Sequence, residues 1–559
     1  MITKRTRLDK ITASLKVERT TFEPSWRENA DYIMTRRTRF FTTERNRGDR
    51  RNQKIINSTA PMAARILQAG MHGGITSPSR PWFLAKTPDP ALNKQYRVRV
   101  WNSDVTDIMA RMFLSTNLYN MLPILYGDMG VFGTGAMSML EDPNKIARFN
   151  TFPIGNYWLG AGPDGTVDRF YREIPYTIWQ LVKEFVVGKD HPGEMHWHHV
   201  TPQVKAAWDN NNYDMRLDVY MFIEPNDDYN DLKLNPKYKK YSITYWEAGA
   251  PDGKFLKESG FDEFPILAPR WDTLGEDTYG TGPGMIVIGD CKGIQSLERK
   301  KGKALDKGID PPLTGPTSMR NQKASLISGD ITYVDVREGQ KGLSPIHEVR
   351  WAMREVGDEM RIHEMRINRG FYVDLFMMMM NSDRREITAR EVEEKHGEKL
   401  MQLGPLVERL DNEVFDPLIA RGFAMMDRLG LIPPKPPELD GVPLKMEYNS
   451  IMHQAQRLIG INNIERFAGF VGNISGARPE TADKVNWDEM IDEYGDRTSI
   501  PPRILNDEMV VKQIRSQRAE MMRQQQQQAA IAQGADTAKL LSQTDTARPS
   551  ALSQLLGTA

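Results

Sequence analysis

The segment REITAREVEEKHGEKLMQLGPLVERLDNEVFDPLIARGF, residues 385–423, contains the best-marked helix start in the chain. Thr388 and Glu391 occupy the N-cap and N3 positions of a capping box, in which two side chains satisfy free backbone N–H groups reciprocally. Ile387 and Val392 occupy the positions of a hydrophobic staple around the same cap. The pattern therefore predicts that a helix begins at residue 388.

This helix is predicted to be long but not straight. Gly404, Pro405 and Pro417 interrupt it, because a proline has no backbone N–H and its ring crowds the preceding turn. The apolar residues that would face the core are Val392, Leu403, Val407, Leu410, Val414 and Leu418. The proline-rich stretch 433–437 ends the helix. We expect a kinked helix that runs from residue 388 to this stretch.

Four consecutive methionines, Met377 to Met380, lie shortly before this helix. Because the capping box fixes the helix start, residues 377–387 are predicted to form a loop between two helices. Methionine is unbranched and polarizable, which suits a surface that adapts to a changing contact. The alternative is that the methionines fill a hydrophobic core, and the sequence leaves both interpretations open.

Two further long helices are predicted upstream of the methionines. The first occupies most of 279–310, between the stretch YGTGPG (279–284) and a pair of prolines. The second runs from about 346 to 376, with the alternating spacing of four and three residues that is typical of a helix packed on other helices. Its spaced residues are Val349, Met353, Val356, Met360, His363 and Ile367. Between these two helices, residues 325–339 are predicted to form a short pair of strands, a small β module.

The N-terminal half divides by composition. Residues 1–55 hold 15 Lys and Arg against 7 Asp and Glu, an excess of 8 positive charges (15 − 7). This segment can contact phosphates, or it can be a solvated arm or a face for partner subunits. Residues 100–140 read as one or two helices. Residues 145–270 carry alternating apolar and polar stretches and are predicted to be rich in β-sheet, with one helix at 176–185.

The C-terminal part is predicted to be helical, with one disordered end. Residues 450–500 have helical character with breaks at glycine and proline. Residues 506–533 combine an acidic first turn with strong helix formers, and we expect a helix that can associate with copies of itself. After Gly534 the chain is rich in Ala, Ser, Thr and Gln, and we expect disorder there.

The overall composition is that of an ordinary globular protein. Of 559 residues, 40% are hydrophobic and 26% are charged, and Lys+Arg and Asp+Glu both number 74. Nucleic-acid-binding proteins are usually basic, so this balance argues against tight, salt-dependent wrapping of DNA. Cys291 is the sole cysteine, which excludes an intrachain disulfide and a cysteine-based metal site. The charged N-terminus and the absence of a long apolar run predict neither a signal peptide nor a membrane span.

No catalytic, cofactor-binding or metal-binding residues are predicted. The stretch YGTGPG (279–284) lacks the βαβ context and the following Gly-Lys-Ser/Thr of phosphate-binding loops, and it is more typical of a helix entry. His196, His198 and His199 suggest a metal cluster, but a strand would turn them to opposite faces. No G-x-S-x-G motif occurs. We therefore expect a protein that is not an enzyme and needs no cofactor.

The predicted order of elements resembles the portal proteins of tailed bacteriophages, and more narrowly the head-to-tail connectors of short-tailed phages. The residues that carry the resemblance are YGTGPG (279–284), GDMGVFGTGA (127–136) and above all residues 385–423. The resemblance covers about 20–505. It implies an α+β, mainly helical portal fold.

The resemblance also implies a closed ring of twelve subunits, a dodecamer. The regions it implies for this chain are an N-terminal arm and wing (1–278), a first stem helix (279–310), a small α/β clip (311–345), a second stem helix (346–376), a tunnel loop (377–387), a kinked helix returning to the wing (388–450), a crown (451–505) and a short, barrel-like C-terminal helix with a disordered tail (506–559).

The implied function is a channel at one capsid vertex of the virion, through which double-stranded DNA is packaged and ejected. The implied partners are terminase, tail adaptor proteins, the capsid, scaffold and internal core proteins, with assembly in the host cytoplasm and no membrane contact. The residues implied to face the channel are Met377, Met378, Met379, Met380, Asn381, Ser382, Arg384 and Arg385. The alternative hypotheses are another self-assembling virion protein without a DNA channel and an unrecognised nucleic-acid enzyme.

Overall fold

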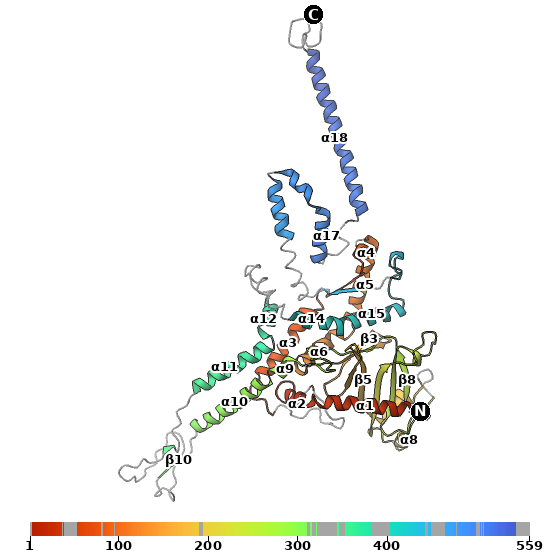
Figure 1. Ribbon diagram of the computed structural model, residues 1–559, viewed down its shortest axis with the longest axis vertical. Coiled ribbons are helices and arrows are strands. Elements are labelled where there is room, and N and C mark those ends of the chain that lie inside the picture. The colour runs from red at the N-terminus through yellow and green to blue at the C-terminus, as the bar shows by residue number, and fades with distance from the viewer. Residues whose placement is uncertain are drawn as a thin grey trace, which may run out of the picture.

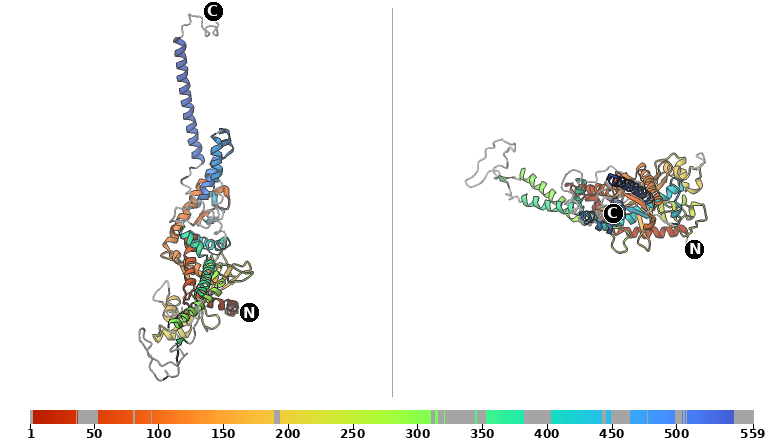
Figure 2. Two further views of the ribbon diagram at one scale, coloured as in Figure 1. Left: turned by 90° about the vertical axis from the view of Figure 1, so that its left-hand side faces the viewer. Right: turned by 90° about the horizontal axis from the view of Figure 1, so that it is seen from above.

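The computed structural model shows a body of helices and β-sheet, from which a helical hairpin and a long C-terminal helix project in different directions (Figure 1). Two further views show the same projections (Figure 2). The structure describes residues 3–35, 37, 53–79, 82–93, 95–188, 194–309, 313–315, 320, 344–345, 353–381, 403–441, 445–448, 464–476, 478–498, 504, 506 and 508–543.

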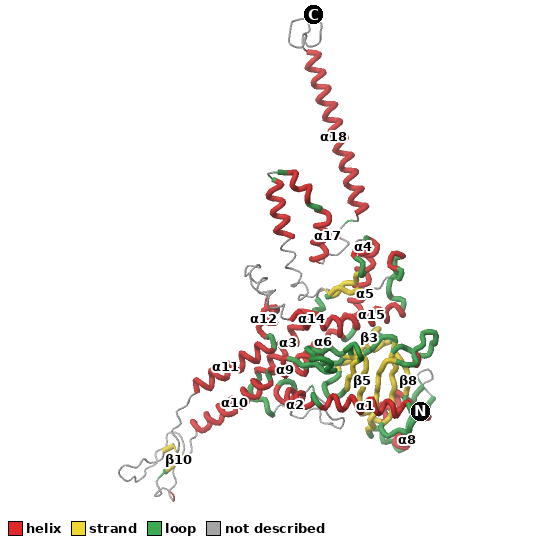
Figure 3. Tube along the Cα trace, in the orientation of Figure 1, coloured by secondary structure: helices red, strands yellow, loops and turns green. Residues whose placement is uncertain are grey.

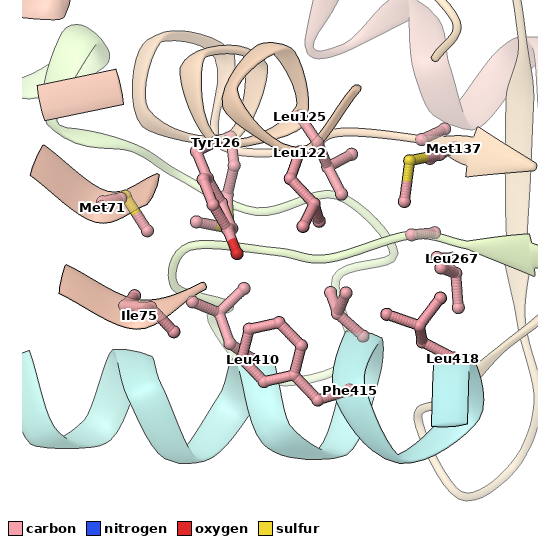
Figure 4. Packing of buried hydrophobic residues seen from close by; sticks show 14 of the residues in the cluster. Met71, Ile75, Leu122, Leu125, Tyr126, Met137, Leu267, Leu410, Phe415 and Leu418 are labelled. Atoms are coloured by element: carbon pink, nitrogen blue, oxygen red, sulfur yellow. The ribbon is translucent and has the colours of Figure 1, made fainter. Parts of the chain in front are cut away.

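The body is built largely from the N-terminal helices and the helices that follow residue 403. The N-terminal helices are α1 (Lys4–Thr20), α2 (Glu23–Tyr32), α3 (Thr59–Ile75), α4 (Pro90–Asn93), α5 (Tyr96–Ser115) and α6 (Leu118–Phe132). Figure 4 shows Met71 of α3 and Tyr126 of α6 near Leu410 and Phe415, which come from far along the chain. All four are buried, so both parts of the sequence share one hydrophobic core.

The strands form antiparallel sheets, drawn in yellow in Figure 3. The five-stranded sheet has the order β4 (Trp158–Ala161), β5 (Val167–Thr177), β6 (Arg216–Pro225), β7 (Tyr241–Glu247) and β8 (Lys257–Phe261). The three-stranded sheet has the order β3 (Ile146–Thr151), β2 (Met137–Asp142) and β9 (Ile266–Leu267). Two-strand pairs join β1 (Phe83–Lys86) to β12 (Lys445–Tyr448), and β10 (Leu313–Thr314) to β11 (Ser344–Pro345). The prediction of a sheet-rich region at 145–270 is confirmed.

The five-stranded sheet is covered on both faces, because side chains alternate along a strand. Phe222 of β6 packs in a cluster with Leu8 and Leu15 of α1. Its neighbour Ile223 belongs to the main core, and Val219 packs beneath two short helices. These helices are α7 (Ile178–Phe185) and α8 (Pro202–Asp209). The helix predicted at 176–185 is therefore present, and it begins at a capping box of Thr177 and Gln180.

The hairpin consists of α10 (Ile288–Ile309) and α11 (Met353–Gly370), and the short helix α9 (Pro283–Ile286) precedes it. Gly282 is the N-cap of α9, so YGTGPG is a helix entry, as predicted. In sequence, the antiparallel pair β10–β11 lies between the two long helices, and the strand pair predicted at 325–339 lies outside the described residues. With a rise of about 1.5 Å per residue, α10 is about 33 Å long.

The second predicted long helix ends differently from the prediction. After α11, Tyr372 has a φ of 55°, and a new helix, α12 (Val373–Asn381), follows. The methionines Met377–Met380 are therefore helical, and the loop expected from residue 377 does not begin before 382. Methionine is a good helix former, and this propensity outweighed the signal of the helix start expected downstream. Residues 382–402, which include Thr388 and Glu391, lie outside the described residues.

The expected breaks after residue 403 are present. Pro405 and Pro417 lie in the first turns of α14 (Gly404–Leu410) and α15 (Asp416–Arg428). A π-helical turn, η6 (Asp411–Phe415), separates the two helices. Proline is tolerated in a first helical turn, where its missing N–H has no intrahelical partner to lose. The short 3-10 helices are η1 (Trp197–His199), η2 (Pro236–Tyr238), η7 (Pro437–Leu439) and η8 (Pro479–Lys484).

The C-terminal helices extend past the body on the side away from the hairpin (Figure 1). A helix over 464–475 is followed by α17 (Trp487–Thr498) and α18 (Glu508–Gln543). The helix predicted to end near residue 533 thus continues to Gln543, and the prediction of disorder directly after Gly534 is wrong. A single glycine lowers the stability of a helix by only about 1 kcal/mol relative to alanine, and the alanines and leucines that follow Gly534 are good helix formers. The prediction of a mainly helical α+β fold is confirmed.

Candidate functional site

At the base of the hairpin, α10 and α11 are in close contact. Nδ1 of His363 lies 2.8 Å from Oδ1 of Asp290, and Nη1 of Arg366 lies 3.4 Å from the same oxygen. Opposite the His363 ring stands Gly293, where a Cβ atom would lie 2.9 Å from Cε1 of the imidazole. A side chain at position 293 would therefore displace the imidazole of His363, so glycine leaves room for this ring between the two helices.

The side chain of Gln295 joins the hairpin to the body. Its Oε1 accepts hydrogen bonds from the backbone N–H groups of Ile56 at 2.6 Å and Asn57 at 2.8 Å, and its Nε2 donates to the carbonyl of Asn57 at 2.7 Å. Gln295 and Cys291 are buried at this junction. Burial, followed by the charge of Asp290, raises the pKa of the Cys291 thiol to about 12, so it stays protonated and unreactive near neutral pH.

The far half of the hairpin is not covered by the body. From Ser296 to Ile309 every α10 side chain is exposed or half-buried. Leu305 is 45% exposed and Ile309 is 83% exposed. In a single chain these apolar side chains are open to solvent.

The methionine helix α12 begins at the base of the same hairpin. Figure 1 shows it beside α3, and a Cβ atom on Gly70 of α3 would lie 2.3 Å from the Phe376 ring. Met377 is 42% exposed and Met378 is half-buried, so Met377 is not core filling within one chain. The structure places the backbones of Met379, Met380 and Asn381 in α12. Of the other predicted channel residues, Ser382, Arg384 and Arg385 lie outside the described residues.

The two glycine-rich stretches singled out in the sequence pack against each other. Gly133, at the end of α6, has a φ of 79°, and a Cβ atom there would lie 2.1 Å from the carbonyl oxygen of Gly280. A Cβ atom on Gly284 would lie 2.5 Å from the carbonyl oxygen of Val131 in α6. The stretches 127–136 and 279–284 thus need glycine because two backbones touch. This contact sets where the first hairpin helix leaves the body.

The sequence profile of the family described as "Bacteriophage head to tail connecting protein" matches residues 5–505. The chain belongs to this family of phage connectors. It is therefore a structural component of a phage particle and not an enzyme.

Two curated relatives of the connector match nearly its whole length. The "Portal protein" of Salmonella phage epsilon15 is 41% identical over 558 residues, which cover 100% of this chain and 99% of the relative. The "Probable portal protein" of Bordetella phage BPP-1 is 36% identical over 542 residues, which cover 97% and 96% of the two chains. The resemblance to portal proteins of short-tailed phages is confirmed.

One structural link of the connector was not predicted. Arg270 donates to Glu413 through its backbone N–H at 2.7 Å, through Nε at 3.0 Å and through Nη2 at 2.6 Å. Nη2 also donates to the carbonyl of Gly165 at 2.9 Å. This largely buried pair joins the π-helical turn η6 to the sheet-bearing part of the connector. No local pattern could reveal it, because the two residues are far apart in sequence.

The histidines that suggested a metal cluster are not arranged as one. His198 and His199 lie in η1, where their ring centroids are 3.7 Å apart. Over the part of the connector that the structure describes, no group of three or more His, Cys, Asp or Glu side chains could hold a metal ion. Within that same part, no helix is long and apolar enough to cross a membrane.

Proposed function

We propose that this connector assembles into a closed ring of twelve copies, and that double-stranded DNA passes through the ring when it is packaged into and ejected from the capsid. The observation that carries the proposal is the α10–α11 hairpin. Its base is fixed to the body through Gln295, while its far half projects with uncovered apolar side chains. A rod of this kind gains cover when copies stand side by side around an axis.

The regions of the chain take the following roles in the proposal. The wing comprises 1–278, the stem helices 279–310 and 346–376, the clip 311–345, the kinked helix 388–450, the crown 451–505 and the C-terminal helix with its tail 506–559. The tunnel segment comprises 377–387, of which residues 377–381 are helical. The clip would dock terminase during packaging and tail adaptor proteins afterwards. The wing would contact the capsid, and scaffold and internal core proteins are further partners, with assembly in the host cytoplasm.

The methionine run Met377–Met380 is the segment proposed to touch DNA. Apolar, deformable side chains can contact a moving duplex without the ionic attraction of Lys or Arg. Each phosphate that a cation neutralises adds affinity through counterion release, which would retard movement. In this proposal Arg384 and Arg385 pair with neighbouring carboxylates or contact phosphates weakly. The position of α12 at the base of the stem supports this role.

The ring is tested on the purified chain by mass photometry and negative-stain electron microscopy. Twelve copies of 63.9 kDa give about 767 kDa, and we expect particles of that mass with a central hole. A population of 63.9 kDa monomers would contradict the ring. Open filaments would favour a virion protein without a DNA channel.

The channel is tested by site-directed cross-linking in filled particles. Because Cys291 is buried and is the sole cysteine, a Ser382→Cys variant would carry one accessible thiol per chain. We expect a photoactivatable reagent on that thiol to cross-link to packaged DNA. The matched control is Ser14→Cys on the exposed face of α1, where no DNA adduct is expected. Equal cross-linking at both positions, or none at 382, would contradict the proposed tunnel loop.

A further inference from the structure

Residues 270–273, Arg-Trp-Asp-Thr, follow β9 and contact several separate parts of the connector, and we call them the anchor segment. The backbone N–H of Trp271 donates to the carbonyl of Gly133, at the end of α6, over 2.8 Å. The carbonyl of Asp272 accepts a hydrogen bond of 2.7 Å from the backbone N–H of Thr281, just before α9. The backbone of the anchor segment is therefore fixed between the body and the entry to the hairpin.

Two side chains of the anchor segment bind the helices after residue 403. Arg270 holds Glu413 of η6 through the three hydrogen bonds described above. Oγ1 of Thr273 accepts a hydrogen bond of 2.7 Å from Nη1 of Arg409 in α14. These are the first described helices after residues 382–402, so the anchor segment fixes the chain on that side of the methionine run.

A third side chain of the anchor segment, Trp271, contacts the junction between α11 and α12. Its ring stacks on the ring of Tyr372, with centroids 6.1 Å apart and an angle of 28° between the planes. Tyr372, with its φ of 55°, stands two residues after the end of α11, where helices often carry glycine. A side chain in this left-handed region crowds the following carbonyl oxygen, so the conformation persists only where packing holds it. The stack on Trp271 contributes that packing.

We propose that Arg270 and Trp271 are positioning residues for the methionine run, because these adjacent side chains fix the chain on both sides of it. Trp271 sets the direction in which α12 leaves the hairpin, and Arg270 sets the place of η6. The inference rests on the proposed function, in which Met377–Met380 touch DNA. Contacts made by adjacent residues of one backbone do not shift independently, so a displacement on one side of the run is passed to the other side.

The strained junction is tested by two substitutions of Tyr372 in the full chain. Glycine adopts a positive φ without strain and alanine does not. We therefore expect Tyr372→Gly to protect the amides of 371–376 from hydrogen exchange about fivefold better than Tyr372→Ala does, after correction for intrinsic rates. In a right-handed conformation the order would be reversed, because alanine is the better helix former. Protection in the glycine variant that is equal or lower contradicts the strained junction, and with it the role of Trp271.

The link between the two sides of the run is tested by hydrogen exchange on the purified chain. Glu413→Gln removes a charge that binds the anchor segment, and we expect exchange about tenfold faster in 409–415. Exchange should also be about threefold faster in 371–376, on the other side of the run. Trp271→Ala should accelerate both stretches, with the larger effect in 371–376. The combined variant should show less than the product of the two effects, because both act through the anchor segment.

Two controls separate positioning from a general loss of packing. Trp179→Ala removes a tryptophan of α7 that is 52% exposed, and exchange in 371–376 and 409–415 should stay unchanged. Tyr372→Phe keeps the stacked ring and should keep the protection of the original chain. Circular dichroism checks that each variant retains its helices. If Trp271→Ala does not fold, Glu413→Gln and the substitutions of Tyr372 still test the proposal.

The DNA cross-link at Ser382→Cys in filled particles reports where the run stands. Adding Trp271→Ala should lower the yield of that cross-link about threefold or more, and adding Tyr372→Phe should preserve it. The proposal is overturned if Glu413→Gln accelerates exchange only in 409–415, or if Trp271→Ala leaves the cross-link unchanged. If the original particles give no cross-link at 382, the proposed function fails. That failure is distinct, because the exchange experiments contain no DNA.

Discussion

Phe376 of α12 lies directly against Gly70 of α3, where a Cβ atom would stand 2.3 Å from two atoms of the aromatic ring. No real Cβ atom approaches another atom so closely, so the contact requires glycine. Phe376 immediately precedes the methionine run Met377–Met380 and is fully buried. The methionines therefore start from a fixed point on the body.

We expect Gly70→Ala to displace α12 from α3. Overpacking of a dense core typically costs about 1–3 kcal/mol, which exceeds the gain of about 1 kcal/mol from replacing a helical glycine with alanine. Thermal unfolding should show a lower Tm, and hydrogen exchange should be faster in 373–381. The control is Gly73→Ala in the same helix, where no atom lies within 4 Å of the new Cβ. That variant should be as stable as the original chain or more stable, and equal behaviour of both variants would contradict the close contact.

Gln295→Leu should loosen the hairpin at its base. The substitution removes three hydrogen bonds between the Gln295 side chain and the backbone of Ile56 and Asn57, each of which contributes about 0.5–1.5 kcal/mol to stability. We expect a lower Tm and faster amide exchange at 53–57 and in the first turns of α10. Gln203→Leu, on the exposed face of α8, is the matched control and should change neither quantity. Unchanged exchange at 53–57 in the Gln295 variant would show that these bonds do not hold the hairpin.

The buried carboxyl of Asp128 should make stability depend on pH. Burial raises its pKa from 3.8 to about 6, while Arg37, whose Nε lies 2.9 Å from Oδ1, opposes that shift. The folded chain therefore holds this proton more tightly than the unfolded chain does. The contribution of Asp128 to stability is consequently greatest below about pH 4, falls as the pH rises to about 6, and is constant above that.

This dependence is measured by comparing the original chain with Asp128→Asn, which cannot ionise. Between about pH 4 and pH 6 the original chain should lose about 3 kcal/mol relative to the variant, visible as a changing difference in Tm. Asp209→Asn removes an exposed carboxylate from the end of α8 and should follow the original chain at every pH. A constant difference in Tm between the Asp128 variant and the original chain would contradict the raised pKa.

Replacing Met377–Met380 with serine should leave the ring intact but reduce the amount of DNA that particles package or retain. Serine removes the apolar contact surface and is also a weaker helix former. Replacement with leucine keeps both properties and should preserve most packaging, since Met and Leu have similar volumes. The control is Met521→Ser/Met522→Ser, two exposed methionines of α18. Normal DNA content in the serine variant at 377–380 would show that these methionines have no role at the channel.

Local patterns predicted the elements whose cause is local. The sheet at 145–270, the capped helix α7, the two hairpin helices and the breaks at Pro405 and Pro417 follow from alternation, capping and proline chemistry, which neighbouring residues determine. The prediction that a loop begins at Met377 is wrong, because methionine is a good helix former and residues 377–381 continue α12. The strong helix start further along the chain does not determine where α12 ends. The candidate site was predicted only as a segment, since exposure and direction depend on packing.

The sequence by itself determined the fold class, the family and the order of rods, sheet and methionines, because periodicity, capping and glycine placement act over a few residues. The tertiary structure alone decided which distant groups meet. Gly70 receives Phe376, Gln295 fixes the hairpin, and Arg270 binds Glu413 only because folding brings these residues together. Such contacts join residues far apart along the chain, and their partners have no fixed spacing that a sequence pattern could reveal.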